Sequence, residues 1–209
     1  MANRANTASQ LSAIRLANAL APPRNGGLGW SLATPNPLYV WGNYNCTNSA
    51  HLASTNTTST VTSALMSDAL TILSSSWQNA ASAGSYSSRN AASADTVNAA
   101  ILTGIVPSTG TSSTTFSGGV YNLPRLLENW SSDTLWLNTA IINLYNSTKA
   151  TAKFVNPGTY YSPPTRQFSF DLNFNDPARQ PPGMPSALVP IRYNWAVPPP
   201  NTVAYNVVP

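Results

Sequence analysis

The side chains that most often perform covalent chemistry are scarce in this sequence of 209 residues. It holds one histidine, His51, one cysteine, Cys46, and six Asp and Glu residues. A nucleophile needs a neighbouring base, and the base needs a third group that orients it. No Asp or Glu lies close to Cys46 and His51 in the sequence. We therefore expect a solvated histidine and an inert cysteine, and a single cysteine leaves no partner for an intramolecular disulfide.

Two carboxylates facing each other across a groove could cleave a glycosidic bond. Glu128 and Asp133 are candidates for such a pair. The simpler interpretation is that Glu128 pairs with Arg125, Asp133 caps a turn, and Asp68 faces solvent from a helix. We adopt the simpler interpretation and predict that the protein is not an enzyme and carries no cofactor.

One short segment spaces oxygen ligands in the way that a calcium site could use. Asp171, Asn173 and Asn175 occupy alternate positions. A calcium-binding EF-hand loop would need glycine at Asp176 and an acid at Pro182, and neither is present. The alternative is that the three residues form the polar face of a strand, because alternate strand residues point the same way.

Aromatic side chains are the second group that could form a binding surface, since the chain has 6 Trp and 9 Tyr. Flat sugar rings stack on aromatic rings and bond to amides, but large aromatics more often fill a core or an interface. The tryptophans that could stack on a sugar include Trp77 and Trp130, and we select as interface or aromatic candidates Trp30, Trp41, Trp136, Tyr160, Tyr161 and Trp195.

Charge is low throughout, at 8% of residues against about 25% in an ordinary domain. The formal net charge is +4, but the basic residues are scattered, so we predict no nucleic-acid partner. No apolar run approaches the ~20 residues that span a bilayer, so we predict no membrane span in this chain. A surface solvated by hydroxyls and amides favours an extracellular or cell-surface location.

The elements that must position these residues are mostly strands. Apolar and aromatic runs bounded by turn residues predict strands over 28–33, 38–44, 97–106, 135–145 and 167–174. The run 135–145 is apolar on both alternating faces, which indicates burial on both sides within a parallel stack. We predict a mainly β fold with a short parallel β-helix-like or stacked-strand core.

One or two helices are expected to cover that core. Leu65, Ala69, Leu73 and Trp77 recur at intervals of four residues, which predicts an amphipathic helix over 61–77. Pro124 suits a first helical turn, so a second short helix is predicted over 123–130. Residues 1–176 then form one module, and the proline-rich segment 177–209 forms an extended C-terminal arm.

Several segments, taken in order, resemble a known family. They are 36–45 (NPLYVWGNYN), 64–74 (ALMSDALTILS) with Trp77, 97–104 (VNAAILTG), 121–130 (YNLPRLLENW), and 160–164 (YYSPP) through 181–183 (PPG). The set resembles the carboxy-terminal region of large bacterial prepilin-like, type IV pilus-assembly-associated surface proteins. The resemblance implies an exported structural module and brings no known catalytic site. Such proteins begin with a long apolar helix, which this sequence lacks, so assembly through that helix is not implied.

We therefore expect a structural component of an extracellular or cell-surface assembly, pilus-associated and acting through subunit contacts. Its predicted partners are further copies of itself in a homo-oligomer or a larger surface assembly. Two other hypotheses remain: a carbohydrate-binding or adhesive module with a glycan partner, and a viral coat or tail protein.

Overall fold

A computed structural model describes residues 11–24, 26, 28–81, 85–89, 92–112, 115–152 and 160–185. Strands dominate it, as the sequence predicts. They are β1 (Ile14–Ala17), β2 (Trp30–Ala33), β3 (Leu38–Trp41), β4 (Ser63–Ser67), β5 (Leu70–Leu73), β6 (Asp95–Thr103), β7 (Arg125–Leu126), β8 (Thr134–Ile142) and β9 (Thr165–Ser169). Short 3₁₀ turns lie between the strands, namely η1 (Ser49–His51), η2 (Asn79–Ala81), η3 (Tyr86–Ser88) and η4 (Gly119–Asn122), or after the last one, namely η5 (Leu172–Asn175) and η6 (Pro177–Arg179).

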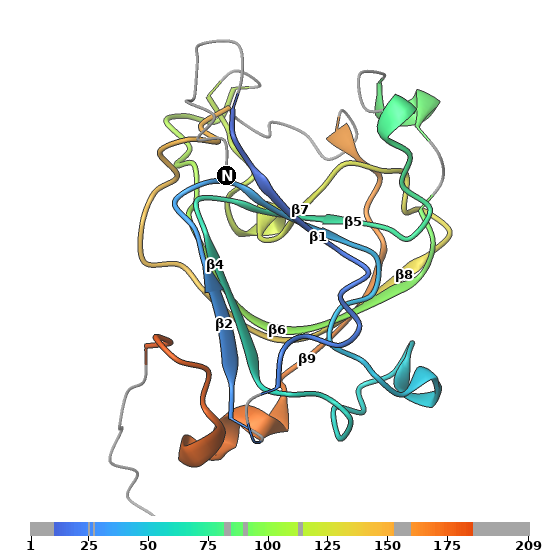
Figure 1. Ribbon diagram of the computed structural model, residues 1–209. Helices are drawn as coiled ribbons and strands as arrows, with labels where there is room; N and C mark the ends of the chain where they lie inside the picture. The colour runs from blue at the N-terminus through green and yellow to red at the C-terminus, as the bar shows by residue number, and fades with distance from the viewer. Residues whose placement is uncertain are drawn as a thin grey trace, which may run out of the picture.

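The strands form two sheets in which every pair is parallel (Figure 1). The first sheet has the order β1-β3-β5-β7, and the second has the order β2-β4-β6-β8-β9. From β1 to β8 the chain alternates between the two sheets, so each strand from β1 to β6 pairs with the one two places further on, whereas β9 pairs with β8. Parallel neighbours cannot be joined by a tight hairpin, and here the connection runs through the other sheet.

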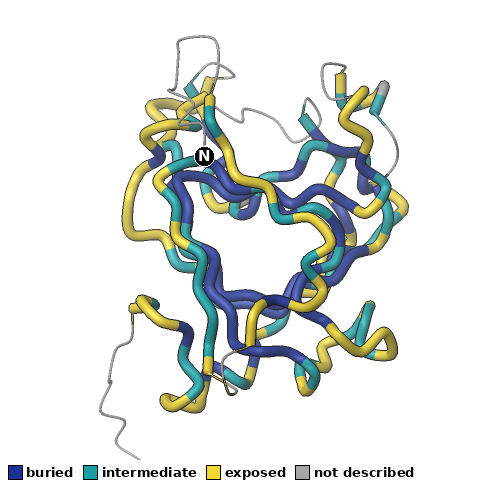
Figure 2. Tube along the Cα trace, in the orientation of Figure 1, coloured by how far each residue is buried: buried dark blue, intermediate teal, exposed yellow. Residues whose placement is uncertain are grey.

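The register aligns apolar side chains into columns that point between the sheets. Leu16, Val40, Ile72 and Leu126 form one column across the first sheet. Val97, Leu137 and Phe168 form another across the second sheet. These columns contribute to one hydrophobic cluster, and Figure 2 shows the buried residues on the strands that face the interior.

A buried asparagine ladder lies on the face of the second sheet opposite the apolar columns. Asn98, Asn138 and Ser169 occupy one register position on β6, β8 and β9. The Nδ2 atom of Asn138 donates to Oδ1 of Asn98 at 2.6 Å, and the Ser169 hydroxyl donates to Oδ1 of Asn138. On the other side, Nδ2 of Asn98 donates to the carbonyl of Asn45 at 3.0 Å. Each amide thus satisfies its neighbour where water cannot reach.

The predicted helix over 61–77 is wrong. The segment forms β4, a turn containing Asp68 and Ala69, and then β5. Four-residue spacing indicates a helix only when the residues between are exposed, and here nearly all of them are buried. Strands within a stack are covered on both faces, and β4 and β5 take their backbone hydrogen bonds from neighbouring strands.

The predicted helix over 123–130 is also wrong. The peptide bond from Leu123 to Pro124 is cis, and residues 125–126 form the short strand β7. Asn129 then makes a parallel bridge to Ser162. The five predicted strands each overlap an observed one, although the last observed strand ends at Ser169 and gives way to η5.

The segment after β9 packs against the outer face of the second sheet. Phe174 lies with Ala64 and Ala100 in a small apolar cluster, which Met66 and Met184 border. The Thr62 hydroxyl donates to the carbonyl of Arg179. The Ser31 hydroxyl donates to the carbonyl of Pro182 at 2.6 Å. The first residues of the predicted arm therefore fold back on β2 and β4. Its remainder, 186–209 with Trp195, lies outside the described residues.

Candidate functional site

A groove hollows the outer face of the first sheet. Arg15 on β1 is paired with Tyr39 on β3. The next residues of the two strands, Leu16 and Val40, point into the core, so the side chains of Arg15 and Tyr39 point outward. The turn after β5 adds Trp77 and Asn79. The resulting cavity has a volume of about 510 Å³ and is lined by Ala13, Ile14, Arg15, Tyr39, Leu73, Trp77, Asn79 and Leu127.

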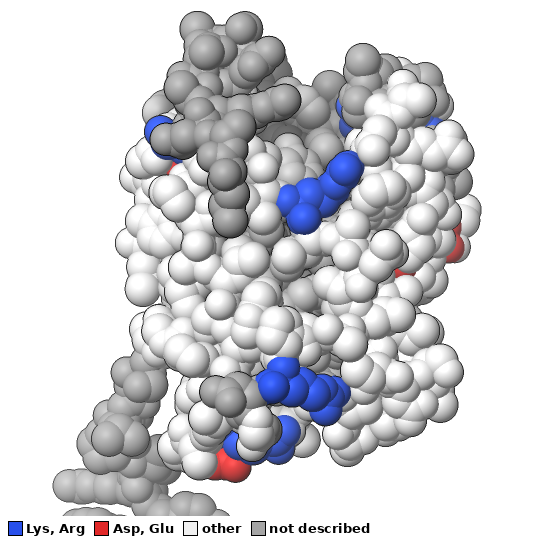
Figure 3. All heavy atoms as spheres, in the orientation of Figure 1, with Lys and Arg blue, Asp and Glu red and all other residues white. Residues whose placement is uncertain are grey.

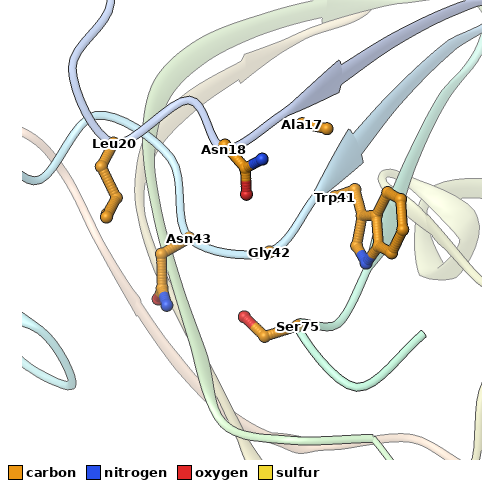
Figure 4. A pocket seen from close by; sticks show the side chains of 7 residues that line it. All are labelled: Ala17, Asn18, Leu20, Trp41, Gly42, Asn43 and Ser75. Carbon is orange, nitrogen blue, oxygen red and sulfur yellow. The ribbon is translucent and has the colours of Figure 1, made fainter.

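A second cavity of about 230 Å³ lies at the ends of β1 and β3. Figure 4 shows its lining residues, which come from β1 and its end, from β3 and its end, and from the turn after β5. They are Ala17, Asn18, Leu20, Trp41, Gly42, Asn43 and Ser75. Gly42 has φ +78°, and a Cβ there would lie 3.0 Å from the Ser75 hydroxyl, so glycine keeps this side of the cavity open.

Stacking joins the walls of the two cavities. The guanidinium of Arg15 lies 4.9 Å from the ring centroid of Trp41. Arg15 lines the larger cavity and Trp41 lines the smaller one, so this contact connects the two cavities. Such cation–π contacts are worth about 0.5–1 kcal/mol at exposed sites. The Nη1 atom of Arg15 also donates to Oδ1 of Asn79 at 2.8 Å. That oxygen accepts a second bond from Nε1 of Trp77 at 3.1 Å. We call the two cavities and this shared wall the Trp41 groove.

Two buried carboxylates hold the turn that borders the Trp41 groove. Glu128 accepts from the backbone nitrogen and hydroxyl of Ser74 at 2.7 and 2.6 Å. Asp95 does the same for Ser75, also at 2.7 and 2.6 Å. The exposed fractions of Glu128 and Asp95 are 0% and 1%. Adjacent serines are therefore fixed by separate acids from β6 and the segment after β7.

The environment of these acids favours their neutral forms. Burial raises the pKa of Asp95 to about 7, with further raising from the charges of Glu128 and Asp133, although the bonds from Ser75 act in the opposite direction. Burial also raises the pKa of Glu128, against the lowering effects of the Ser74 bonds and the Arg89 charge. Because both carboxylates are buried and bonded within the protein, they support the groove and do not face a ligand.

The predicted pairing of Glu128 with Arg125 is wrong, because Ser74 supplies the hydrogen bonds to that carboxylate. Arg125 instead donates to the carbonyl of Ala150 at 2.8 Å. Asp133 uses its backbone to bond Trp130 and Thr165. Glu128 and Asp133 therefore do not flank any described cavity as a pair.

Asp68 also differs from its expected place, since it is 95% buried and not on an exposed helix face. Its carboxylate accepts from the backbone nitrogens of Thr148, Lys149 and Ala150. Burial alone would raise the pKa of Asp68, but these three donors and the Thr148 hydroxyl lower it overall. Asp68 thus fixes the loop that follows β8.

The calcium candidate does not form a set of converging oxygens. Asp171 caps η5 by accepting from the backbone nitrogen of Asn173 at 3.0 Å, and the Asn173 side chain turns its Nδ2 atom toward that same carboxylate at 2.9 Å. Asn175 is exposed at the end of the turn. Across the described ranges, no three His, Cys, Asp or Glu side chains lie where they could share a metal ion.

His51 and Cys46 lie in the loop between β3 and β4. His51 makes side-chain bonds to Ser59 at 3.0 Å and Asn48 at 3.3 Å. Cys46 is buried, and burial raises the pKa of its thiol, which disfavours a thiolate nucleophile.

The five aromatic candidates that the structure describes do not share one site. Trp41 belongs to the groove, whereas Tyr161 is fully buried and Trp30 and Tyr160 pack against the core. Trp136 is half-buried on β8, away from the groove. Sequence reasoning missed Arg15 and Asn79, and it placed Trp77 on a helix. Tyr39 and Trp41 are two residues apart on β3, so the sequence could indicate that both lie on one face of the strand. Only the register of β1 with β3 shows that Arg15 lies beside them.

A third cavity, of about 240 Å³, opens at the edge of the stack that ends in β7 and β9. It is lined by Val120, Leu123, Pro124, Leu126, Leu135, Arg166 and Phe168. Leu126 and Phe168 are the last members of the inward columns described above. Phe168 is 42% exposed because no further described strand covers it. We call this surface the stack end.

None of the described helical segments is long and apolar enough to cross a membrane. In comparisons with known proteins, no family model, no curated protein and no solved structure matches this chain.

Proposed function

We propose that the protein is a structural component of an extracellular or cell-surface assembly, and that it acts through contacts between copies of itself. The observation that carries this proposal is the stack end. There the apolar columns of a parallel stack stop without a covering strand in the described part of the chain, and Phe168 stays 42% exposed.

The fold supports this proposal because a stack of this kind extends by addition. We interpret the alternation of strands between two parallel sheets as a short parallel β-helix. Each layer of such a stack offers backbone N–H and C=O groups for hydrogen bonds to the next layer. Each layer also adds one apolar side chain to every column. A second copy could supply the next layer at the stack end.

The opposite edge of the stack has matching features. Its columns begin at β1 and β2, where Ile14 is 37% exposed and Leu16 and Leu32 are partly buried. A contact between the β7–β9 edge of one copy and the β1–β2 edge of another would be heterologous. Contacts of that type repeat and produce rings or filaments.

Few charged side chains protect the edges of the stack against edge-to-edge pairing. Figure 3 shows a face that is mostly uncharged, with Lys and Arg in a few separate places. Edge strands are commonly protected by charged side chains, and β9 carries one, Arg166. The cell-surface location rests on the low charge of the whole sequence, and the pilus association rests on the motif resemblance alone.

The test is self-association of the purified protein, followed by light scattering and negative-stain electron microscopy. We expect concentration-dependent oligomers or filaments from the wild type and a monomer from Phe168→Glu, since a charge at the stack end would be buried by the contact. Leu144→Glu is the matched control, because Leu144 is 68% exposed and lies outside the stack end. A wild type that stays monomeric at every concentration would contradict the proposal, and so would an association that Phe168→Glu leaves unchanged.

A further inference from the structure

We propose that the Trp41 groove is a binding site for an acidic oligosaccharide, one that contains uronate sugars. Nothing in the assembly role requires such a site. The inference rests on three features of the groove: its aromatic walls, its neutral polar groups and the single charge that it carries.

The groove offers aromatic surfaces on both sides of a central wall. Trp41 lines the cavity of about 230 Å³, while Tyr39 and Trp77 line the cavity of about 510 Å³. Sugar rings pack their C–H faces against aromatic rings, which lose little conformational entropy on binding. The smaller cavity suits one sugar ring against Trp41, and the larger suits the sugars that follow in the chain.

Neutral polar side chains surround the smaller cavity, as ligand hydroxyls require (Figure 4). Oδ1 of Asn43 accepts from the backbone nitrogen of Thr96 at 2.7 Å, which orients the amide and leaves its Nδ2 atom as a donor. Ser75 donates its hydroxyl proton to Asp95, so its oxygen can accept a bond from a ligand. Asn18 supplies a second amide at the end of β1.

The charge of the groove selects an anionic ligand. Among the described residues that line the two cavities, Arg15 is the one that carries a charge, and none is Asp or Glu. Its bond to Asn79 uses one of the five N–H donors of the guanidinium. The planar guanidinium can form a bidentate pair with a carboxylate, which is the group that distinguishes uronates from neutral sugars.

Internal bonds hold the groove in place before any ligand arrives. Asp95 and Glu128 fix the turn at Ser74 and Ser75, and the Oδ1 atom of Asn79 links Arg15 to Trp77. A site that is already ordered loses less free energy on binding. The low charge of the whole chain therefore does not prevent recognition, because one fixed cation supplies the selectivity.

The test is isothermal titration of the full chain with oligogalacturonate and with a malto-oligosaccharide of equal length. We expect measurable binding of the acidic ligand and at least tenfold weaker binding of the neutral one. Trp41→Ala should weaken oligogalacturonate binding about tenfold, the equivalent of one stacking contact of about 1.4 kcal/mol. Trp41→Phe should retain most of the affinity, because an aromatic face remains.

Arg15→Gln should weaken binding of the acidic ligand about tenfold and leave the neutral ligand unchanged. Trp136→Ala, on the other sheet, is the matched control and should bind as the wild type does. Thermal unfolding followed by circular dichroism shows that each variant is folded. The proposal is overturned if neither ligand binds, if the neutral ligand binds as tightly as the acidic one, or if Trp136→Ala weakens binding as much as Trp41→Ala.

Discussion

The Nδ2 atom of Asn138 donates to the Oδ1 atom of Asn98 at 2.6 Å across the boundary between β8 and β6. Both side chains have an exposed fraction of 0%. A buried amide without partners is costly, so the two strands are held in the register that allows this bond. A shift of β8 by one residue would turn Asn138 toward the apolar core, away from Asn98, and break the ladder.

Asn98→Ala should lower the free energy of unfolding by about 2–3 kcal/mol, because it removes partners of Asn138 and Asn45 in the buried interior. Urea denaturation followed by tryptophan fluorescence measures this change. Asn175→Ala is the matched control, because Asn175 is exposed, and it should change stability by less than about 0.5 kcal/mol. Equal effects of the two substitutions would contradict a structural role for the ladder.

Stability should fall as the pH rises from about 4 to about 7, because of Asp95. Its pKa is raised from the ordinary 3.8 to about 7 in the folded protein, so over this interval the folded state binds the proton and the unfolded state has lost it. A single such group lowers the free energy of unfolding by up to about 1.4 kcal/mol per pH unit. Above this window both states are ionised and the Asp95 contribution is constant. Glu128, whose pKa is also raised, acts in the same direction.

Denaturation in urea at a series of pH values tests this profile. Asp95→Asn should flatten the decline, since the neutral amide cannot ionise. Ser75→Ala should extend the decline to higher pH, because the lost hydroxyl donor stabilised the ionised carboxylate. If the stability of Asp95→Asn fell with pH as steeply as that of the wild type, groups other than Asp95 would cause the pH dependence.

Asp68→Ala should release the loop at 148–150. Three consecutive backbone nitrogens lose a charged acceptor, and we expect a loss of about 3 kcal/mol in stability. Hydrogen exchange read by mass spectrometry should show faster exchange at these amides. Asp176→Ala is the control, because its carboxylate accepts one backbone bond, from Ala178, at an exposed turn and should cost about 1 kcal/mol. Unchanged exchange at 148–150 in Asp68→Ala would count against this role.

Gly29→Ala should loosen the segment 177–185 from β2. A Cβ at this position would lie 2.6 Å from Cα of Pro181 and 2.8 Å from the Thr62 hydroxyl, so the segment must move. Overpacking of this kind costs about 1–3 kcal/mol. Limited trypsin digestion should cut after Arg179 faster than in the wild type. Leu28→Ala, at a neighbouring side chain that is 53% exposed, should be cut at the wild-type rate. Equal rates for the two variants would show that the segment is not held by this contact.

Much of the fold could be predicted from local composition. The strand at 97–106 could be recognised because its apolar run is short, partly β-branched and ended by Pro107. The strand at 135–145 could be recognised because apolar residues on both faces indicate a strand buried within a stack. The pattern at 61–77 failed for a related reason. When a segment is buried on every side, apolar residues occur at nearly every position. The sequence pattern of two strands joined by a turn then also contains apolar residues four positions apart, as a helix does.

The candidate site could be predicted only in part. Trp41 was recognisable as an aromatic candidate, but Arg15, Trp77 and Asn79 became its neighbours through the register of β1 with β3 and the path of the turn after β5. The buried acids could not be foreseen, because Glu128 meets Ser74 across 54 residues of sequence.

The sequence alone determined that strands predominate and that ionisable groups are scarce, since both follow from residue types, although it predicted helices where β4, β5 and β7 form. Tertiary structure decided which side chains meet. Parallel strands in a stack pair with partners two elements away, so the neighbours of each residue depend on loop paths and register, and no local pattern encodes these. That is why Arg15 and Trp41 form one wall of a groove although nothing in their own segments points to the other.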